Sequence, residues 1–255
     1  MFYVIIQLLK LLLIMKLFKK ILKIILRTLG FKLIRLGKPY QPNPYGKINI
    51  ETIKCINNSK GVLHLGAHKG TEAEVYNWFG KKVIWFEASP ETFSHLKDNL
   101  YFYSDQVAFC ALLGNQDDVY KDFFISSNDS ASSSIFKFSQ LVEKDGFFGR
   151  KIFMKKKIKL KMSKLDTILY NNNIDPSEYD HWEVDLQGAE LLAFQGGVNS
   201  LKKCNSISVE ISKIQYYEGG VLWEDLVKWL REKNFYPTEI PECDHTEILF
   251  KRKID

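Results

Sequence analysis

GVLHLGAHKGTEAEVYNWFGKKVIWFEASPETFSHLKDNL, residues 61–100, contains two short apolar runs, each followed by a segment of helical period. The apolar runs are residues 61–66 and 82–87, and the helical segments are residues 71–79 and 90–100. Alternation of short apolar strands with helices is typical of a mostly parallel sheet that carries helices on both faces. This stretch therefore predicts an α/β fold.

The same alternation extends to both sides of this stretch. Further helices are expected at residues 49–57, 189–195 and 222–233, and further strands at residues 106–110, 181–186 and 206–212. Residues 235–240 and 246–252 predict two closing strands joined by a turn at residues 241–244. The prediction is a doubly wound, Rossmann-like sheet with a C-terminal antiparallel hairpin.

Residues 117–161 interrupt this pattern with weaker periodicity and many Ser, Phe and Lys residues. Long segments of this kind inside compact domains are usually functional, so we expect an insertion that covers the site. Within it, residues 155–161 alternate like an edge strand with a basic outer face.

The charge of the chain is concentrated at its N-terminus. The sequence of 255 residues has 36 Lys and Arg and a net charge of +6, but residues 1–36 hold eight basic residues and no acid. Removing these eight from the total of 36 leaves 28 basic residues against 30 acidic ones. A nucleic-acid-binding body is therefore not expected.

Residues 1–36 are otherwise almost wholly apolar, and their longest uncharged run, residues 1–9, is far shorter than the roughly 18–20 apolar residues of a spanning helix. Lys16, Lys23 and Arg27 fall on one helical stripe, which predicts an amphipathic helix lying on an anionic membrane surface. A helix packed on protein is the alternative. We expect a Pro-rich linker at residues 37–47, a domain at residues 48–255, and a cytoplasmic protein associated peripherally with a membrane.

Chemically useful residues fall where the predicted parallel strands end, and these ends meet at one edge of a sheet. The first strand runs into Gly66-Ala-His-Lys-Gly70, whose backbone N–H groups are expected to be free for an anionic ligand. Glu87 ends the second strand, where an acid can bind the two hydroxyls of an adenosine ribose. Asp185 follows the fourth strand and Glu210 lies on the fifth.

VDLQGAE at residues 184–190, followed by Gly196-Gly197, is the most specific motif of the chain, and LGAHKG at residues 65–70 and WFEASP at residues 85–90 support it. With these motifs and a serine-rich run at residues 129–134, the chain resembles the FkbM family of S-adenosylmethionine-dependent methyltransferases. Members of that family mostly methylate hydroxyls of sugars and similar acceptors. The resemblance implies a class I methyltransferase sheet, S-adenosylmethionine as cofactor, and O-methylation of a saccharide or glycolipid-type acceptor.

The resemblance and the strand-end positions together assign candidate residues. Asp185 would lie nearest the transferred methyl group, with Glu210 as its partner in accepting a proton and His68 as a further base. The candidates for cofactor binding are His64, Gly66, Ala67, Gly70, Glu87, Ala111, Leu112 and Asp185. A divalent metal held by Asp185 and Glu210 is the less favoured reading, since no third acid or histidine spacing accompanies them.

Alternatives remain for several of these positions. Asp185 also suits the N-cap of the following helix, and His181 and His245 are interpreted as structural. His64 and His68 stand where the family often has Asp and Asn. A catalytically inactive, membrane-tethered binding protein that keeps the fold is therefore the competing hypothesis.

Overall fold

The computed structural model describes residues 50–147 and 151–253. The helix predicted over residues 1–36 and the linker over residues 37–47 lie outside these described residues. Within the described ranges, no helix is both long enough and apolar enough to cross a membrane.

The predicted elements are present with bounds that differ by a few residues, and several short elements that were not predicted lie between them. The helices are α2 (Ile50–Asn58), α3 (Ala73–Trp78), α4 (Pro90–Leu100), α5 (Gln140–Asp145), α6 (Leu165–Asn171), α7 (Glu190–Gly196), α8 (Val198–Leu201), α9 (Trp223–Glu232) and the short 3₁₀ helix η1 (Pro176–Glu178). The strands are β1 (Gly61–Leu65), β2 (Lys82–Glu87), β3 (Gln106–Cys110), β4 (Leu112–Leu113), β5 (Val119–Ser126), β6 (Met154–Ser163), β7 (His181–Val184), β8 (Ser206–Ser212), β9 (Phe235–Pro237) and β10 (His245–Arg252).

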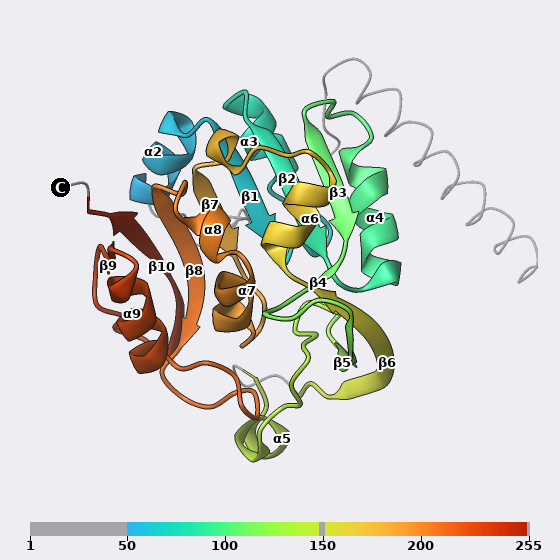
Figure 1. Cartoon of the computed structure of the whole chain (residues 1–255). Coiled ribbons are helices and arrows are strands. Elements are labelled where there is room, and N and C mark those ends of the chain that lie inside the picture. The colour runs from blue at the N-terminus through green and yellow to red at the C-terminus, as the bar shows by residue number, and fades with distance from the viewer. Residues whose placement is uncertain (1–49, 148–150, 254–255) are drawn as a thin grey trace, which may run out of the picture. The chain divides into compact units, whose positions relative to one another are not determined.

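In the described part of the chain, seven strands form the main sheet in the order β3-β2-β1-β7-β8-β10-β9. The five strands from β3 to β8 are parallel, and β10 runs antiparallel to both β8 and β9. This order confirms the predicted doubly wound sheet with its C-terminal antiparallel hairpin. The parallel strands all end at one edge of the sheet, which faces β5, β6 and α5 (Figure 1).

Alternate residues of the central strands pack on opposite faces of the sheet, as the two-residue period of a strand requires. Leu63, Leu65 and Phe86 pack against α6 to α9, whereas Val62 and Trp85 pack against α2, α3 and α4. β1 is buried along its whole length, which explains why its sequence is apolar at every position except His64 rather than alternating. The two apolar layers fix the positions of the strand ends.

The segment predicted as an insertion contains two strands that its weak periodicity did not reveal at full length. β5 and β6 pair antiparallel, and β4 pairs with the end of β6, so the three form a second sheet. The lysine-rich strand predicted at residues 155–161 is part of β6, and its lysines are exposed. The connection from β5 to β6 passes the carboxyl ends of the main sheet (Figure 1).

Candidate functional site

A pocket lies at the carboxyl ends of β1, β2 and β7, under the connection that follows β5. Of the predicted cofactor-binding residues, five line it: Gly66, Glu87, Ala111, Leu112 and Asp185. His68 also lines it, together with Gln187 and the serines at positions 130 and 133. Five of the eight predicted cofactor-binding residues therefore lie together at one pocket.

Gly66 is required where β1 ends because the backbone there passes very close to the end of β7. Its φ is +93°, and a Cβ at this position would lie 1.7 Å from the carbonyl oxygen of Asp185. Any side chain would collide with backbone in a conformation that only glycine adopts readily. The glycine thus brings the ends of β1 and β7 together at the pocket.

Four of the five backbone amides of this turn, all but that of Lys69, donate within the protein, contrary to the sequence-based expectation that they are free. The N–H groups of Gly66 and Ala67 both donate to the carbonyl of Phe86, at 3.0 and 2.9 Å, and that of Gly70 donates to the carbonyl of Ala67. The N–H of His68 donates to Glu87. The turn therefore uses its donors to hold β2 and its acid in place, and it offers the pocket a close backbone surface rather than an anion-binding site.

Glu87 is buried at the end of β2 and is held by the backbone on both carboxylate oxygens. Its Oε2 accepts from the His68 N–H at 2.9 Å, and its Oε1 accepts from the Ser89 N–H at 2.8 Å. Burial raises the pKa of this carboxyl to about 7, against the lowering effect of these hydrogen bonds. Because a carboxylate offers about four acceptor positions, Glu87 keeps further lone pairs for donors in the pocket.

Three predicted cofactor-binding residues do not line the pocket. His64 points to the opposite face of β1, where its ring stacks on Trp85 with centroids 4.5 Å apart and Nδ1 is 3.0 Å from the hydroxyl of Tyr76. Ala67 is buried in the same apolar layer, and Gly70 packs against the side chains of Leu96 and Trp85 on that face. Strand alternation explains the difference for His64, since its neighbours in β1 face the other way.

His68 lines the pocket but is not arranged as a base at Nε2. That nitrogen lies 2.8 Å from the carbonyl oxygen of Asp129, which can only accept, so Nε2 carries the proton. Lys69 forms an ion pair with the carboxylate of Asp129. His68 and Lys69 therefore hold the turn at Asp129 and Ser130 over the pocket. Asp129 and Ser130 both have positive φ.

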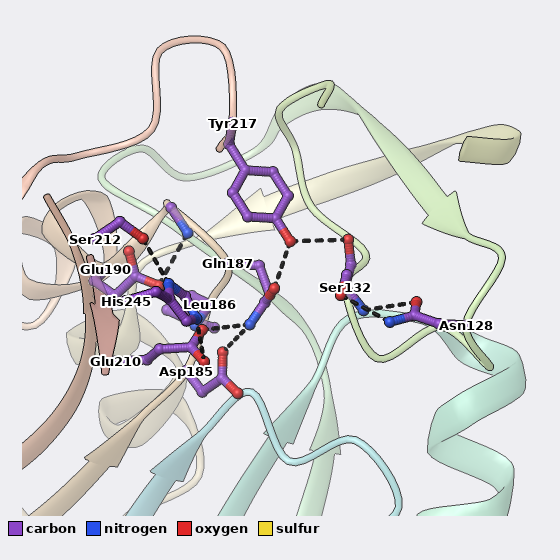
Figure 2. Close-up of polar contacts among 11 residues, drawn as sticks. Asn128, Ser132, Asp185, Leu186, Gln187, Glu190, Glu210, Ser212, Tyr217 and His245 are labelled. Atoms are coloured by element: carbon purple, nitrogen blue, oxygen red, sulfur yellow. Dashed lines mark hydrogen bonds and ion pairs between the residues drawn. The ribbon is translucent and has the colours of Figure 1, made fainter. Parts of the chain in front are cut away.

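Asp185 and Glu210 lie close together, as predicted, and Gln187 bridges them (Figure 2). The Gln187 amide donates from Nε2 to Oδ1 of Asp185 and to Oε2 of Glu210, each at 2.5 Å. Its carbonyl oxygen accepts from the hydroxyl of Tyr217, which also donates to the carbonyl of Ser132 at 3.2 Å. Asp185 faces the pocket, whereas Glu210 lies behind it on β8.

Both carboxyls of this pair hold protons more tightly than isolated ones. Burial, followed by the charge of Glu210 and a hydrogen bond to it, raises the pKa of Asp185 well above its usual range. Burial raises the pKa of Glu210 to about 7. Near neutral pH, Asp185 is therefore protonated and donates to Glu210, which is itself partly protonated.

Glu190, the acid that ends the signature motif, is a structural residue of the same turn. Its Oε1 accepts from the N–H groups of Leu186 and Gly188, both at 3.0 Å. These bonds hold a turn in which Gln187 has a φ of +54° and Gly188 of +97°. Glu190 thereby fixes the position of the Gln187 amide.

Gln187, Tyr217 and His245 belong to this site but were not predicted from the sequence. Gln187 had a signal, since it lies inside the signature motif between the two acids. Tyr217 and His245 had none, because they reach the site from the β8–α9 loop and from β10, far along the chain. His245, interpreted as structural, contacts Glu210 directly at 2.8 Å.

No group of three or more His, Cys, Asp and Glu side chains in residues 50–147 and 151–253 is placed to hold a metal ion. At Asp185 and Glu210, the amide of Gln187 lies between the carboxylates and donates to both.

The fold and site define an α/β enzyme of the class I methyltransferase type. A model of the methyltransferase FkbM domain matches residues 64–237, about two thirds of the chain. The chain therefore belongs to the FkbM methyltransferase family and is an S-adenosylmethionine-dependent methyltransferase. No curated protein sequence matches it significantly.

Solved structures with similar folds are distant in sequence. Precorrin-6y C5,15-methyltransferase from Geobacter metallireducens is 9% identical with a TM-score of 0.46, and the match covers 86% of this chain and 95% of that one. TrmK from M. capricolum, in complex with S-adenosylhomocysteine, is 12% identical with a TM-score of 0.43 over 80% and 66% of the two chains. Fibrillarin from Aeropyrum pernix, in complex with S-adenosylmethionine, is 12% identical with a TM-score of 0.42 over 76% and 67%. Similarity at this level carries no argument about the acceptor.

Proposed function

We propose that the enzyme methylates a hydroxyl oxygen on a saccharide or glycolipid-type acceptor. The observation that carries this proposal is the pair of neighbouring carboxyls of Asp185 and Glu210, which Gln187 bridges, with Asp185 facing the pocket. A neutral hydroxyl must lose its proton as it becomes an ether, so a base beside the reacting oxygen is what this reaction needs. The preference for a saccharide comes from the family resemblance.

The pocket residues suggest how the cofactor is held. S-adenosylmethionine supplies a methyl group that is already activated on a sulfonium, so the protein's task is chiefly alignment and proton removal. We propose that Glu87 binds the ribose hydroxyls, that Gly66 borders the methionine portion, and that Ala111 and Leu112 flank the adenine. The free lone pairs of Glu87 support the first of these roles.

Asp185 and Glu210 would act together on the acceptor. As the acceptor oxygen bonds to the methyl carbon and the carbon–sulfur bond breaks, the hydroxyl proton passes to Asp185. The proton that Asp185 already holds passes to Glu210, so neither acid has to hold two protons. Gln187 keeps both carboxyls oriented through its amide N–H groups.

The test is methyl transfer from radiolabelled S-adenosylmethionine by the full-length protein to a panel of saccharides and glycolipids, with RNA and peptides alongside. We expect the wild type to transfer the methyl group to a hydroxyl acceptor and the Asp185→Asn variant to fail to do so. Transfer only to nitrogen acceptors, or equal transfer by wild type and variant, would contradict the proposal. Cofactor binding without transfer to any acceptor would favour the inactive binding protein.

We further propose, from the sequence alone, that residues 1–36 bind an anionic membrane surface. Sedimentation of the full-length protein with vesicles of anionic phospholipid, but not with vesicles of neutral phosphatidylcholine, is the expected result. Equal binding to both, or no binding, would favour a segment that packs on protein.

A further inference from the structure

His245 stands at the end of the acid pair that lies away from the cofactor pocket. Its Nε2 is 2.8 Å from Oε1 of Glu210, and its Nδ1 is 2.7 Å from the hydroxyl of Ser212. The aromatic rings of Phe147 and Tyr216 pack edge-on against the imidazole, at centroid distances of 5.5 and 5.4 Å. The side chain is only 9% exposed, so its orientation is fixed.

A second small pocket lies on this side of Gln187. It is lined by Glu210, Ser212, Tyr217 and His245 together with Gln187, which also lines the cofactor pocket. A continuous chain of polar groups therefore runs from Asp185 through Glu210 to His245, and part of it is drawn in Figure 2.

We propose that His245 is a proton-relay residue that receives, through Glu210, the proton leaving the acceptor hydroxyl. This inference rests on the proposed function. One proton moves in three transfers: from the acceptor oxygen to Asp185, from Asp185 to Glu210, and from Glu210 to Nε2 of His245. The charges balance, because the sulfonium becomes a neutral thioether while the imidazole becomes an imidazolium.

The contacts of His245 suit this role. Ser212 can accept a hydrogen bond from Nδ1–H, and the lone pair of Nε2 then accepts one from protonated Glu210. Burial lowers the pKa of His245, which keeps the ring neutral and able to take a proton at rest. The titratable groups that face it are Glu210, Asp185 and Glu190 from the ends of β8 and β7 and the start of α7, with Tyr216 and Tyr217 from the following loop.

The chain contains a matched control at the opposite end of the same strands. His181 has Nδ1 2.7 Å from the hydroxyl of Ser206 and Nε2 2.9 Å from Oε1 of Glu183. It has the same partners by type, but it lies where β7 and β8 begin, away from Asp185. A purely structural histidine should behave like His181.

The test is nitrogen NMR of the full-length protein labelled with ¹⁵N-histidine, with His245→Gln and His181→Gln used to assign the signals. His245 is expected to rest as the neutral Nδ1–H tautomer. Glu210→Gln should lower its pKa by about one unit, a roughly tenfold change in proton affinity, and Asp185→Asn should lower it as well. His181 should not respond to either substitution.

Saturation with S-adenosylmethionine should lower the pKa of His245 relative to saturation with S-adenosylhomocysteine, since only the former carries the sulfonium charge. The relay would be overturned if His245 rests as the Nε2–H tautomer or is already charged at neutral pH. It would also be overturned if neither Glu210→Gln nor Asp185→Asn changes the pKa of His245. Failure to bind either cofactor would instead refute the proposed function, while the tautomer and the response to Glu210→Gln still decide the inference.

Discussion

The two ends of the parallel sheet contain the same three residue types in different surroundings. At the amino end, His181 contacts Ser206 and Glu183, and at the carboxyl end, His245 contacts Ser212 and Glu210. The imidazole of His181 is completely buried, and in the described part of the chain its acid, Glu183, has no bridge to a second acid at a pocket. Glu210, the acid beside His245, is bridged through Gln187 to Asp185, which lines the pocket. The difference between the two ends is therefore the second acid and the pocket, on which the role proposed for His245 depends.

Positive φ angles occur at both ends of the sheet, as at Gly80 just before β2, but they cluster in the two turns at the pocket, at Gly66, His68, Gly70, Gln187 and Gly188. At the amino end, Asp180 accepts ordinary hydrogen bonds from the Lys60 N–H at 2.8 Å and the Asn205 amide at 3.0 Å. Uncommon backbone conformations concentrate at functional sites, and here they bring Gly66 and Gln187 to the pocket.

The largest effect is expected for Gly66→Ala. The added methyl would overlap the carbonyl of Asp185, and the φ of +93° adds strain. Cofactor affinity of the folded protein should fall by more than about 100-fold, measured by calorimetric titration with S-adenosylhomocysteine.

The matched control for this variant is Gly61→Ala at the other end of β1, where a Cβ would lie 2.6 Å from the carbonyl oxygen of Glu178. This change should lower the melting temperature but leave the affinity of the folded protein unchanged. Equal losses of affinity in the two variants would break the distinction between the two ends.

The next effect concerns the acids that flank β7. Asp185→Asn removes the group that faces the acceptor and should slow methyl transfer by about 100- to 10,000-fold, with little change in cofactor affinity. Asp180→Asn, at the start of the strand, should cost stability only. Rates of transfer at saturating cofactor measure both, and comparable losses of rate in the two variants would contradict the assignment of Asp185.

The smallest effect is expected for Tyr217→Phe, which removes the hydroxyl that donates to Gln187 and to the Ser132 carbonyl. Stability should fall by about 1 kcal/mol, measured by urea unfolding. Ser206→Ala, which removes one hydrogen bond at the amino end, should cost about the same. Hydrogen exchange should quicken in residues 126–134 only in Tyr217→Phe, and unchanged exchange there would show that the tyrosine does not hold this segment.

The fold could be predicted from the sequence because its central strands are buried on both faces. β1 is apolar except for His64, β2 is apolar between Lys82 and Glu87, and the helices that follow them keep their own period. β5 could not be predicted as clearly, because its residues alternate between partly buried, exposed and buried positions in a small second sheet. Strand pairing over a long separation, as between β5 and β6, leaves no local signal in the sequence.

The residues of the candidate site that stand at the ends of the parallel strands could be predicted from the sequence. Gly66, Glu87 and Asp185 follow from that rule, and all three line the pocket. The prediction that His64 binds the cofactor does not fit the structure, because strand alternation directs its side chain to the other face of the sheet, toward Trp85. His245 could not be found, because its role depends on β10 pairing beside β8, which only the folded sheet reveals.

The central claim is that S-adenosylmethionine binds at the carboxyl end of the sheet through Glu87. Calorimetric titration of the full-length wild type, Glu87→Ala and Glu183→Ala with S-adenosylmethionine tests it most directly, with Glu183, the acid that contacts His181, as the control. The ribose hydroxyls need the ionised carboxylate, and burial raises the pKa of Glu87 to about 7. Wild-type affinity should therefore weaken as pH falls below about 7, by up to roughly tenfold per unit.

Glu87→Ala is expected to abolish binding of S-adenosylmethionine, and Glu183→Ala is expected to bind it like the wild type, with the same dependence on pH. Undiminished binding by Glu87→Ala, or loss of binding in Glu183→Ala when that variant is folded, would contradict the central claim.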